Sequence, residues 1–317
     1  PSNYEVISFN EDGVCNFCVN HKKKIFKGKE SFITDLNLAL GEKVGVTVSG
    51  GKDSIFAWYK LVNIFGAKNV IAFNHNKVGL VHHMAKENLL TAKKVLGSEL
   101  VIVDDCDFLD RFRFNLSNFL ESPNPAIIKV ALCMGCRFGI YGKMFQTGFG
   151  RGISKFVEAG SYLERSSFKV DLIKKIGAGN YLKGLLSCLD ENTWCDRSQV
   201  EIDHENWKNP KLFKPKGFNH YDEVKCINFF HYFENNPFLS KETVRKECFW
   251  KDPGNDWHFD CRIELIKELL FLSLLGYTEN DCKLSAMIRY NLINRETAKK
   301  EIEKKNDEIE ASFEEEC

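Results

Sequence analysis

Short apolar runs and longer amphipathic stretches alternate along this chain. Five runs have the length and composition of buried strands, at residues 44–48, 70–73, 100–103, 154–159 and 224–230. Amphipathic stretches typical of helices follow the first two of these runs, at residues 55–65 and 80–96. This alternation predicts an α/β fold with a doubly wound parallel sheet, covered by helices on both faces.

The pattern also divides the chain into three predicted parts. Residues 1–30 form a small N-terminal segment, residues 31–235 contain the sheet, and residues 236–317 form a C-terminal helical region. Residues 171–222 lose the alternation and include a stretch rich in lysine and proline, which indicates an insertion or a lid.

Composition favours a globular enzyme over a small binding module. The chain has 317 residues, 44% of them hydrophobic, so it can bury a large core. Its 44 basic and 44 acidic residues give no overall attraction to nucleic acid or to an anionic membrane. The longest apolar stretch is too short to span a bilayer and no secretory signal opens the chain, so we expect a cytoplasmic protein without membrane contact. In that compartment two CxxC pairs among the 12 cysteines indicate metal or redox sites.

The turn between the first predicted strand and helix carries Ser-Gly-Gly-Lys-Asp-Ser at residues 49–54. Two glycines let the backbone approach an anion, and the N-terminus of the following helix supplies amide donors and a favourable dipole. Lys52 adds a positive charge, while Asp53 suits either a Mg²⁺ ligand or a helix N-terminal carboxylate. A Walker A loop has four residues between its glycines, so this is a different phosphate loop. The bland alternative is a glycine-rich turn without a ligand.

The hexapeptide resembles the signature of the PP-loop superfamily of ATP pyrophosphatases, the adenine nucleotide alpha hydrolase-like proteins. The resemblance implies that ATP is split between its α and β phosphates. A substrate carbonyl oxygen then receives AMP, and a nitrogen or sulfur nucleophile displaces it. Lys52 and Asp53 are the implied catalytic residues of the loop. The implied ATP-binding residues are Ser49, Gly50, Gly51, Lys52, Asp53, Ser54, Phe73, His75 and Gly160.

Residues 7–18, ISFNEDGVCNFC, resemble the N-terminus of N-acetyl sugar amidotransferases. In that subfamily an earlier CxxC pair completes a zinc ribbon, so we expect further residues before Pro1. Cys15 and Cys18 have the spacing that lets two thiolates bind one Zn²⁺, and His21 is a weaker third candidate. The alternative is a pair of reduced cysteines beside a β-turn.

A second pair, Cys133 and Cys136, lies in the middle of the chain. We expect it near the start of a helix at residues 137–145, where a thiolate is favoured. The pair resembles the cluster-binding segment of tRNA 2-thiolation enzymes, which hold a 4Fe-4S cluster with three cysteines. Cys248 is the first choice for the third ligand and Cys226 the second. A second zinc site, a catalytic disulfide pair and inert cysteines are the alternatives.

Four residues are candidates for binding the acceptor. Glu164 follows the fourth strand, and the C-terminal third contains Trp250, His258 and Asp260 within segments that resemble the closing helices of sugar amidotransferases. A sugar or base suits stacking on Trp250, while His258 and Asp260 suit acid, base or anchoring roles. Purely structural roles in helix packing are the alternative.

These features predict ATP-dependent adenylation followed by sulfur transfer. The alternative is an amidotransferase that uses ammonia to make an acetamidino sugar, and a second alternative is a nucleotide-binding protein without turnover. We expect a small-molecule, sugar or peptide-like acceptor. Candidate partners are a sulfur-donor protein, a glutaminase subunit and a second copy of the chain. A tRNA is less favoured by the zero net charge, although the basic run at residues 22–29 offers a local phosphate site.

Overall fold

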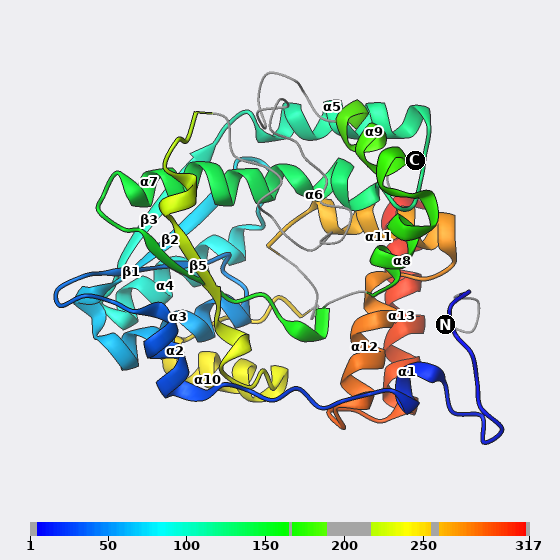
Figure 1. Ribbon diagram of the computed structural model, residues 1–317, viewed down its shortest axis with the longest axis horizontal. Coiled ribbons are helices and arrows are strands. Elements are labelled where there is room, and N and C mark those ends of the chain that lie inside the picture. Colours follow the sequence, from blue (N-terminus) through cyan, green and yellow to red (C-terminus); the bar gives the residue numbers. More distant parts are fainter. Residues whose placement is uncertain (1–4, 165–166, 189–216, 255–259, 315–317) are drawn as a thin grey trace.

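A five-stranded parallel sheet forms the centre of the computed structural model, which describes residues 5–164, 167–188, 217–254 and 260–314 (Figure 1). The strand order is β3-β2-β1-β4-β5, and each neighbouring pair is parallel. The strands are β1 Val44–Thr47, β2 Val70–Lys77, β3 Glu99–Asp105, β4 Lys155–Glu158 and β5 Lys225–Asn228. The predicted α/β class with a parallel sheet is confirmed.

Side chains alternate between the two faces of the sheet, and each face has its own core. Val70 and Ala72 of β2 pack in a core with residues of α3 and α4, whereas Ile71 and Phe73 pack in another with residues of α7. The helices of the first face are α2 Gly28–Leu36, α3 Lys52–Phe65, α4 His83–Leu96 and α10 Pro237–Cys248. The second face is covered by the π-helical segment η2 Gly139–Met144 and by α7 Phe145–Phe149.

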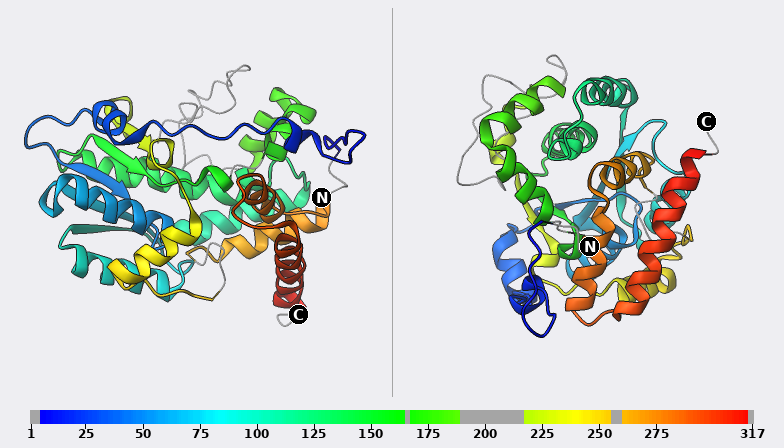
Figure 2. Two further views of the ribbon diagram at one scale, coloured as in Figure 1. Left: turned by 90° about the horizontal axis from the view of Figure 1, so that it is seen from below. Right: turned by 90° about the vertical axis from the view of Figure 1, so that its right-hand side faces the viewer.

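A helical part stands beside the sheet (Figures 1 and 2). A third core joins residues of α5, α6, α8, α9 and α11. Those helices are α5 Phe108–Glu121, α6 Ile128–Phe138, α8 Ser167–Ile176, α9 Ala178–Cys188 and α11 Ile263–Leu275, followed by α12 Glu279–Arg289 and α13 Arg295–Glu314. The short elements are α1 Asn16–Val19, η1 Ala67–Asn69, η3 Tyr162–Glu164, η6 Tyr221–Glu223 and η7 Phe229–His231. The N-terminal segment brings α1 next to α12, where His21 contacts Tyr290.

Two predicted elements differ from the structure in ways that matter for the site. The second strand was expected at residues 70–73, but β2 continues to Lys77 because its polar residues still pair with β3, up to Lys77 opposite Asp105. The helix near Cys133 was expected to begin close to that residue, but α6 begins at Ile128. Cys133 therefore lies in the middle of α6 and Cys136 near its end. Both are beyond the first turn, where the helix N-terminus cannot favour their thiolates, so that expectation is wrong.

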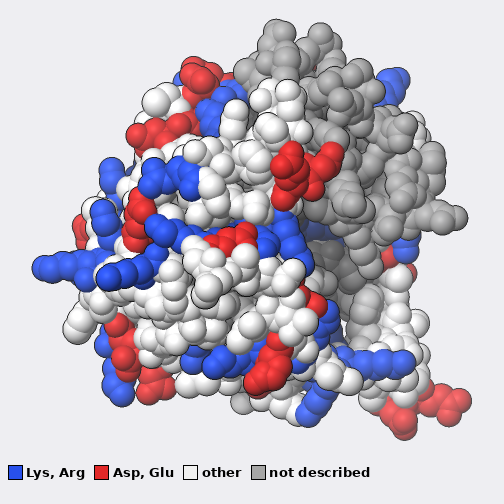
Figure 3. All heavy atoms as spheres, turned by 60° about the vertical axis from the view of Figure 1, so that its left-hand side comes forward, with Lys and Arg blue, Asp and Glu red and all other residues white. Residues whose placement is uncertain are grey.

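The described helices include none that is both long and apolar enough to cross a membrane. On the face shown in Figure 3, lysine and arginine side chains are interspersed with aspartate and glutamate. This agrees with the equal numbers of basic and acidic residues, so any binding of a charged ligand depends on local groups. The predicted domain boundaries and the insertion at residues 171–222 stay predictions.

Candidate active site

The phosphate loop lies where β1 ends and α3 begins. Gly51 is the N-cap of α3, so the amides of the first helical turn face the loop. Gly50 has φ of 93°, and a Cβ at this position would lie 2.4 Å from the carbonyl oxygen of Ala85. Only glycine therefore fits between the loop and α4.

Hydroxyl groups fix the shape of this loop from within. The backbone N–H of Ser49 donates to Ser54 Oγ at 3.2 Å, and Ser54 Oγ donates to the Gly51 carbonyl at 2.9 Å. The N–H of Gly51 donates to Ser49 Oγ at 3.3 Å. The two serines thus hold the turn open in one conformation, which leaves its amide edge ready for an anion.

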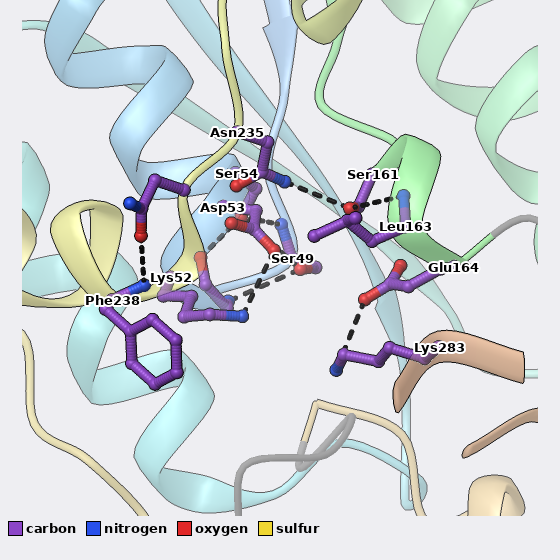
Figure 4. A network of polar contacts seen from close by, with 12 residues as sticks. Ser49, Lys52, Asp53, Ser54, Ser161, Leu163, Glu164, Asn235, Phe238 and Lys283 are labelled. Carbon is purple, nitrogen blue, oxygen red and sulfur yellow. Dashed lines mark hydrogen bonds and ion pairs between the residues drawn. The ribbon is translucent and has the colours of Figure 1, made fainter. Parts of the chain in front are cut away.

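Lys52 and Asp53 form an ion pair at the mouth of the loop, with 3.2 Å between Lys52 Nζ and Asp53 Oδ2 (Figure 4). The other carboxylate oxygen, Asp53 Oδ1, is buried and has no hydrogen-bond partner in the part of the chain that the structure describes. A buried carboxylate oxygen without a partner is costly unless a cation or a bound water satisfies it. Asp53 therefore fits the predicted Mg²⁺ ligand.

A cavity of about 440 Å³ opens beside this loop at the carboxyl ends of the strands. Ligands of open α/β sheets bind at this edge. Most of the residues predicted from the sequence line it: Ser49, Gly51, Lys52, Asp53, Ser54, His75, Cys136, Gly160, Glu164, Trp250 and Asp260. The fold therefore brings the predicted nucleotide, cysteine and acceptor residues together in one place.

His75 lies on the wall of the cavity, and Asp105 fixes its ring. His75 Nε2 is 2.9 Å from Asp105 Oδ2, and both residues are buried. Arg111 Nη2 and Lys143 Nζ also donate to this carboxylate, each at 2.5 Å. Burial opposes ionisation of Asp105, but these three donors together hold its pKa below the ordinary value.

Space for the His75 ring exists because residue 139 is glycine. A Cβ on Gly139 would lie 2.1 Å from His75 Cε1. The π-helical turn that begins at Gly139 follows α6 directly, so it brings the end of that helix, with Cys136, against β2. π-Helical turns of this kind are frequent at functional sites.

Cys136 is the cysteine that lines the cavity. Lys77 Nζ is 3.8 Å from Cys136 Sγ, and Lys77 is buried. Burial opposes the thiolate, but Lys77 and then His75 lower the pKa of Cys136 to about 7. The thiolate of Cys136 is therefore favoured by side chains of β2 and not, as expected from the sequence, by the N-terminus of a helix.

A third cysteine, Cys261, lies in this group just before α11. Burial raises the pKa of Cys261 to about 12, and the charges of Lys77, Cys136, Cys133 and Asp260 also act on it. Lys77 in turn interacts with all three thiols and with Asp260, and against burial these groups raise its pKa. Cys133, Cys136 and Cys261 pack against the same core, and Lys77 Nζ is in contact with the Cys136 sulfur.

The two cysteines expected from the sequence to join Cys133 and Cys136 lie elsewhere. Cys248 is 1% exposed and packs with Val244 and Trp250 on the face of the sheet that α3 covers. Strand alternation places His75 and Lys77 on the other face of β2, with Ile71 and Phe73. Cys226 lies in β5, opposite Phe156 of β4. Burial raises the pKa of Cys248 to about 12 and that of Cys226 well above its ordinary value. Cys261 therefore replaces both as the third candidate ligand.

Sequence reasoning missed Cys261, Lys77 and Asp105. Cys261 directly follows Asp260, which was predicted to contact the substrate. This position next to a predicted site residue could have identified Cys261 as a candidate ligand. Lys77 and Asp105 were hidden because each lies at the end of a strand longer than its apolar run, so only the register of β2 with β3 places them at the site.

Two further predicted residues have clear structural neighbours. Glu164 Oε1 is 3.7 Å from Lys283 Nζ of α12, and Gly160 accepts a hydrogen bond from Asn228 Nδ2 at 2.9 Å (Figure 4 shows the first pair). Phe73 does not line the cavity, because its ring is fully buried against Phe156 and its carbonyl accepts from Val48 N. His258 lies outside the described residues.

The N-terminal pair, Cys15 and Cys18, lies apart from this cavity. The two thiols are hydrogen-bonded to each other at the turn that begins α1. Within the described ranges, the only group of three histidine, cysteine, aspartate or glutamate residues whose ligand atoms lie within 4.8 Å of one another consists of Glu264, Glu268 and Glu279. The buried Lys267 pairs with all three carboxylates. Zinc at Cys15 and Cys18 remains a prediction from their spacing.

Comparisons with known proteins give distant likenesses. No family model and no curated protein match the chain. The U34-tRNA thiolase NcsA from Methanococcus maripaludis, solved with its 4Fe-4S cluster, has a TM-score of 0.38 and 19% identity over 86% of this chain and 85% of that chain. The glutamine-dependent NAD⁺ synthetase from Acinetobacter baumannii, in complex with ADP, has a TM-score of 0.34 and 17% identity over 45% of this chain and 25% of that chain. Both proteins have only weak structural and sequence similarity to this chain. The function therefore has to be inferred from the residues of the site.

Proposed function

We propose that this chain is an ATP pyrophosphatase that adenylates a carbonyl or amide oxygen and then replaces that oxygen with sulfur. The observation that carries the proposal is that the phosphate loop and Cys136 line the same cavity. A nucleophile that acts on an adenylated carbon has to be held within reach of the nucleotide.

The first step uses the loop and the start of α3. Backbone amides of residues 49–54 and the charge of Lys52 hold the β and γ phosphates of ATP, and Asp53 binds Mg²⁺. The acceptor oxygen attacks the α-phosphorus, the bond to the β-phosphate oxygen breaks, and pyrophosphate leaves. The adenylated carbon is then open to attack by a nucleophile.

The second step exchanges oxygen for sulfur without a change in oxidation state. Hydrosulfide adds to the activated carbon, its proton is released, and the carbon–oxygen bond breaks so that the original oxygen leaves with AMP. The product is a thioamide or thiocarbonyl. The apolar side chains of Val81, Ile140 and Met144 line part of the cavity, which helps to keep water away from the adenylate.

Cys133, Cys136 and Cys261 are the candidates to hold a 4Fe-4S cluster, because all three pack against the same core and Cys136 lines the cavity. A cluster held by three thiolates has one iron free of protein, which would supply a binding place for inorganic sulfide. Lys77 offsets the negative charge of the thiolates, and His75 positions Cys136 through its contact with Asp105. Ammonia as the nucleophile would leave these thiols without a role.

Metal analysis of anaerobically purified protein tests this proposal before any acceptor is known. We expect about four irons and four sulfides per chain in the wild type, loss of both in Cys261→Ser, and retention in Cys248→Ala. The Cys248→Ala control removes a buried thiol that packs on the other face of the sheet. Zinc in place of iron, or equal iron content in both variants, would contradict the cluster and favour the ammonia-dependent amidotransferase. The small-molecule, sugar or peptide-like nature of the acceptor stays a prediction.

A further inference from the structure

A second pocket lies between the N-terminal segment, η3, η7 and the end of α12. Its volume is about 350 Å³. His21, Lys24, Tyr162, His231, Arg289 and Tyr290 contribute most of its lining, and no aspartate or glutamate lines it. This basic-aromatic pocket is separate from the cavity at the phosphate loop, and the proposed chemistry makes no use of it.

The potential inside the basic-aromatic pocket is positive. Within the described ranges no carboxylate lies at ion-pair distance from Arg289. The charge of Glu234 acts on Tyr162, but Glu234 is exposed and does not line the pocket. An anion that enters would therefore meet Arg289 and a lining that contains no carboxylate.

Aromatic rings form the rest of the lining. The Tyr162 and Tyr290 rings are 5.1 Å apart at an angle of 57°, and the His21 ring meets Tyr290 edge-on at 4.8 Å. Lys24 Nζ donates to the Phe230 carbonyl at 2.8 Å and lies 4.8 Å from the centre of the Tyr162 ring. The cations are thus held next to ring faces on which a planar group can pack.

We propose that the basic-aromatic pocket binds one nucleotide unit other than ATP, with its phosphate at Arg289 and Lys24 and its base against Tyr162 or Tyr290. Cations beside stacking rings are the combination that binds nucleotides without reading base identity. The same chemistry occurs in a free nucleotide, such as the nucleotide part of an activated sugar, and in a strand of RNA. The basic run at residues 22–29, which includes Lys24, adjoins the pocket.

Two elements connect this pocket to the active-site cavity. The turn η3 provides Tyr162 to the pocket and Glu164 to the cavity. Helix α12 provides Lys283, which pairs with Glu164, and Arg289 at its last residue. The bound nucleotide would therefore lie close to the adenylation site, as part of the acceptor. That the nucleotide is part of the acceptor rests on the proposed function, whereas its binding to the basic-aromatic pocket does not.

Calorimetric titration with uridine 5′-monophosphate tests the proposal, with the loop site filled by α,β-methylene ATP. We expect one further binding event, weakened about 5- to 100-fold in Tyr290→Leu and by a similar factor in Arg289→Gln. Arg113→Gln is the matched control, because Arg113 is an exposed arginine on α5, outside both pockets. Thermal unfolding and ATP cleavage measured on the same samples separate this result from misfolding and from failure of the adenylation step.

The remaining titrations identify the source of the nucleotide. Competition between uridine 5′-monophosphate and a short single-stranded oligoribonucleotide, lost in Arg289→Gln, supports a polynucleotide. Binding of the mononucleotide alone supports a free nucleotide. The proposal is overturned if uridine without phosphate binds equally well, if Arg289→Gln and Arg113→Gln behave alike, or if no second event occurs while ATP cleavage is intact.

Discussion

The indole N–H of Trp250 donates a hydrogen bond to the carbonyl oxygen of Gly50 at 3.0 Å, across 200 positions of sequence. Trp250 is buried and follows α10, so the C-terminal region secures the phosphate loop from the side. The indole N–H of Trp250 is therefore used to hold the phosphate loop and not to bind an acceptor. The predicted contact between Trp250 and an acceptor can involve only the face of its ring.

Trp250→Phe tests this support. The change keeps an aromatic ring but removes the donor to Gly50, so we expect ATP affinity to fall by about 2- to 10-fold, the effect of one hydrogen bond. Trp58→Phe is the control, since Trp58 Nε1 donates to Ser98 Oγ at the same 3.0 Å and neither residue lines the cavity. Trp58→Phe should lower the melting temperature without changing ATP affinity. Equal losses of affinity in the two variants would contradict the role of Trp250.

Asp53→Asn tests the magnesium ligand. An amide keeps the shape of the side chain but loses the charge that a hard cation requires. We expect pyrophosphate release to fall by about 100-fold or more, the scale of losing one electrostatic contact to a transition state. Higher Mg²⁺ should recover part of the rate. Asp110→Asn, at an exposed position of α5, should have no effect, and normal release in Asp53→Asn would exclude the assignment.

Gly139→Ala probes the fit between η2 and β2. The added methyl group would lie 2.1 Å from the His75 ring, so either the π-helical turn or the ring has to move. We expect a loss of about 1–3 kcal/mol in the free energy of unfolding, as for other overpacked sites. Gly150→Ala serves as the comparison, because a Cβ there meets nothing closer than 3.5 Å. A similar stability for both variants would argue against the close packing.

Asp105→Asn has a pH-dependent effect whose sign follows from its partners, His75, Arg111 and Lys143. Because the folded protein lowers the pKa of Asp105, the carboxylate stabilises the fold above its unfolded pKa of about 3.9. That stabilisation is lost as the pH falls toward the lower folded value. Near neutral pH, removing the charge takes the closest carboxylate away from the buried Arg111. We therefore expect the variant to unfold more easily by about 3–5 kcal/mol.

Denaturant unfolding of Asp105→Asn and wild type between pH 2 and 7 measures this difference. The difference in the free energy of unfolding between wild type and Asp105→Asn should be largest at pH 6 to 7 and decrease below about pH 4. Asp104→Asn, at the neighbouring exposed position, should show a small difference that changes little with pH. A difference for Asp105→Asn that stays constant down to pH 2 would mean that its carboxylate is not the stabilising form.

The sequence by itself determined the parallel α/β sheet and the place of the phosphate loop. Both are encoded locally: strand and helix differ in the period of their apolar residues, and residues 49–54 directly connect one of each. The same locality explains why the predicted loop residues line one cavity, since any loop after β1 lies at the carboxyl edge of the sheet.

Only the tertiary structure decided which distant residues join that loop. Cys261, not Cys248, accompanies Cys136, because Cys248 is on the opposite face of the sheet and no local pattern reports this. Lys77 reaches the thiols because β2 stays paired with β3 beyond its apolar run, and backbone hydrogen bonds continue where hydrophobicity ends. The charge that favours the Cys136 thiolate therefore depends on strand register, which a single sequence does not contain.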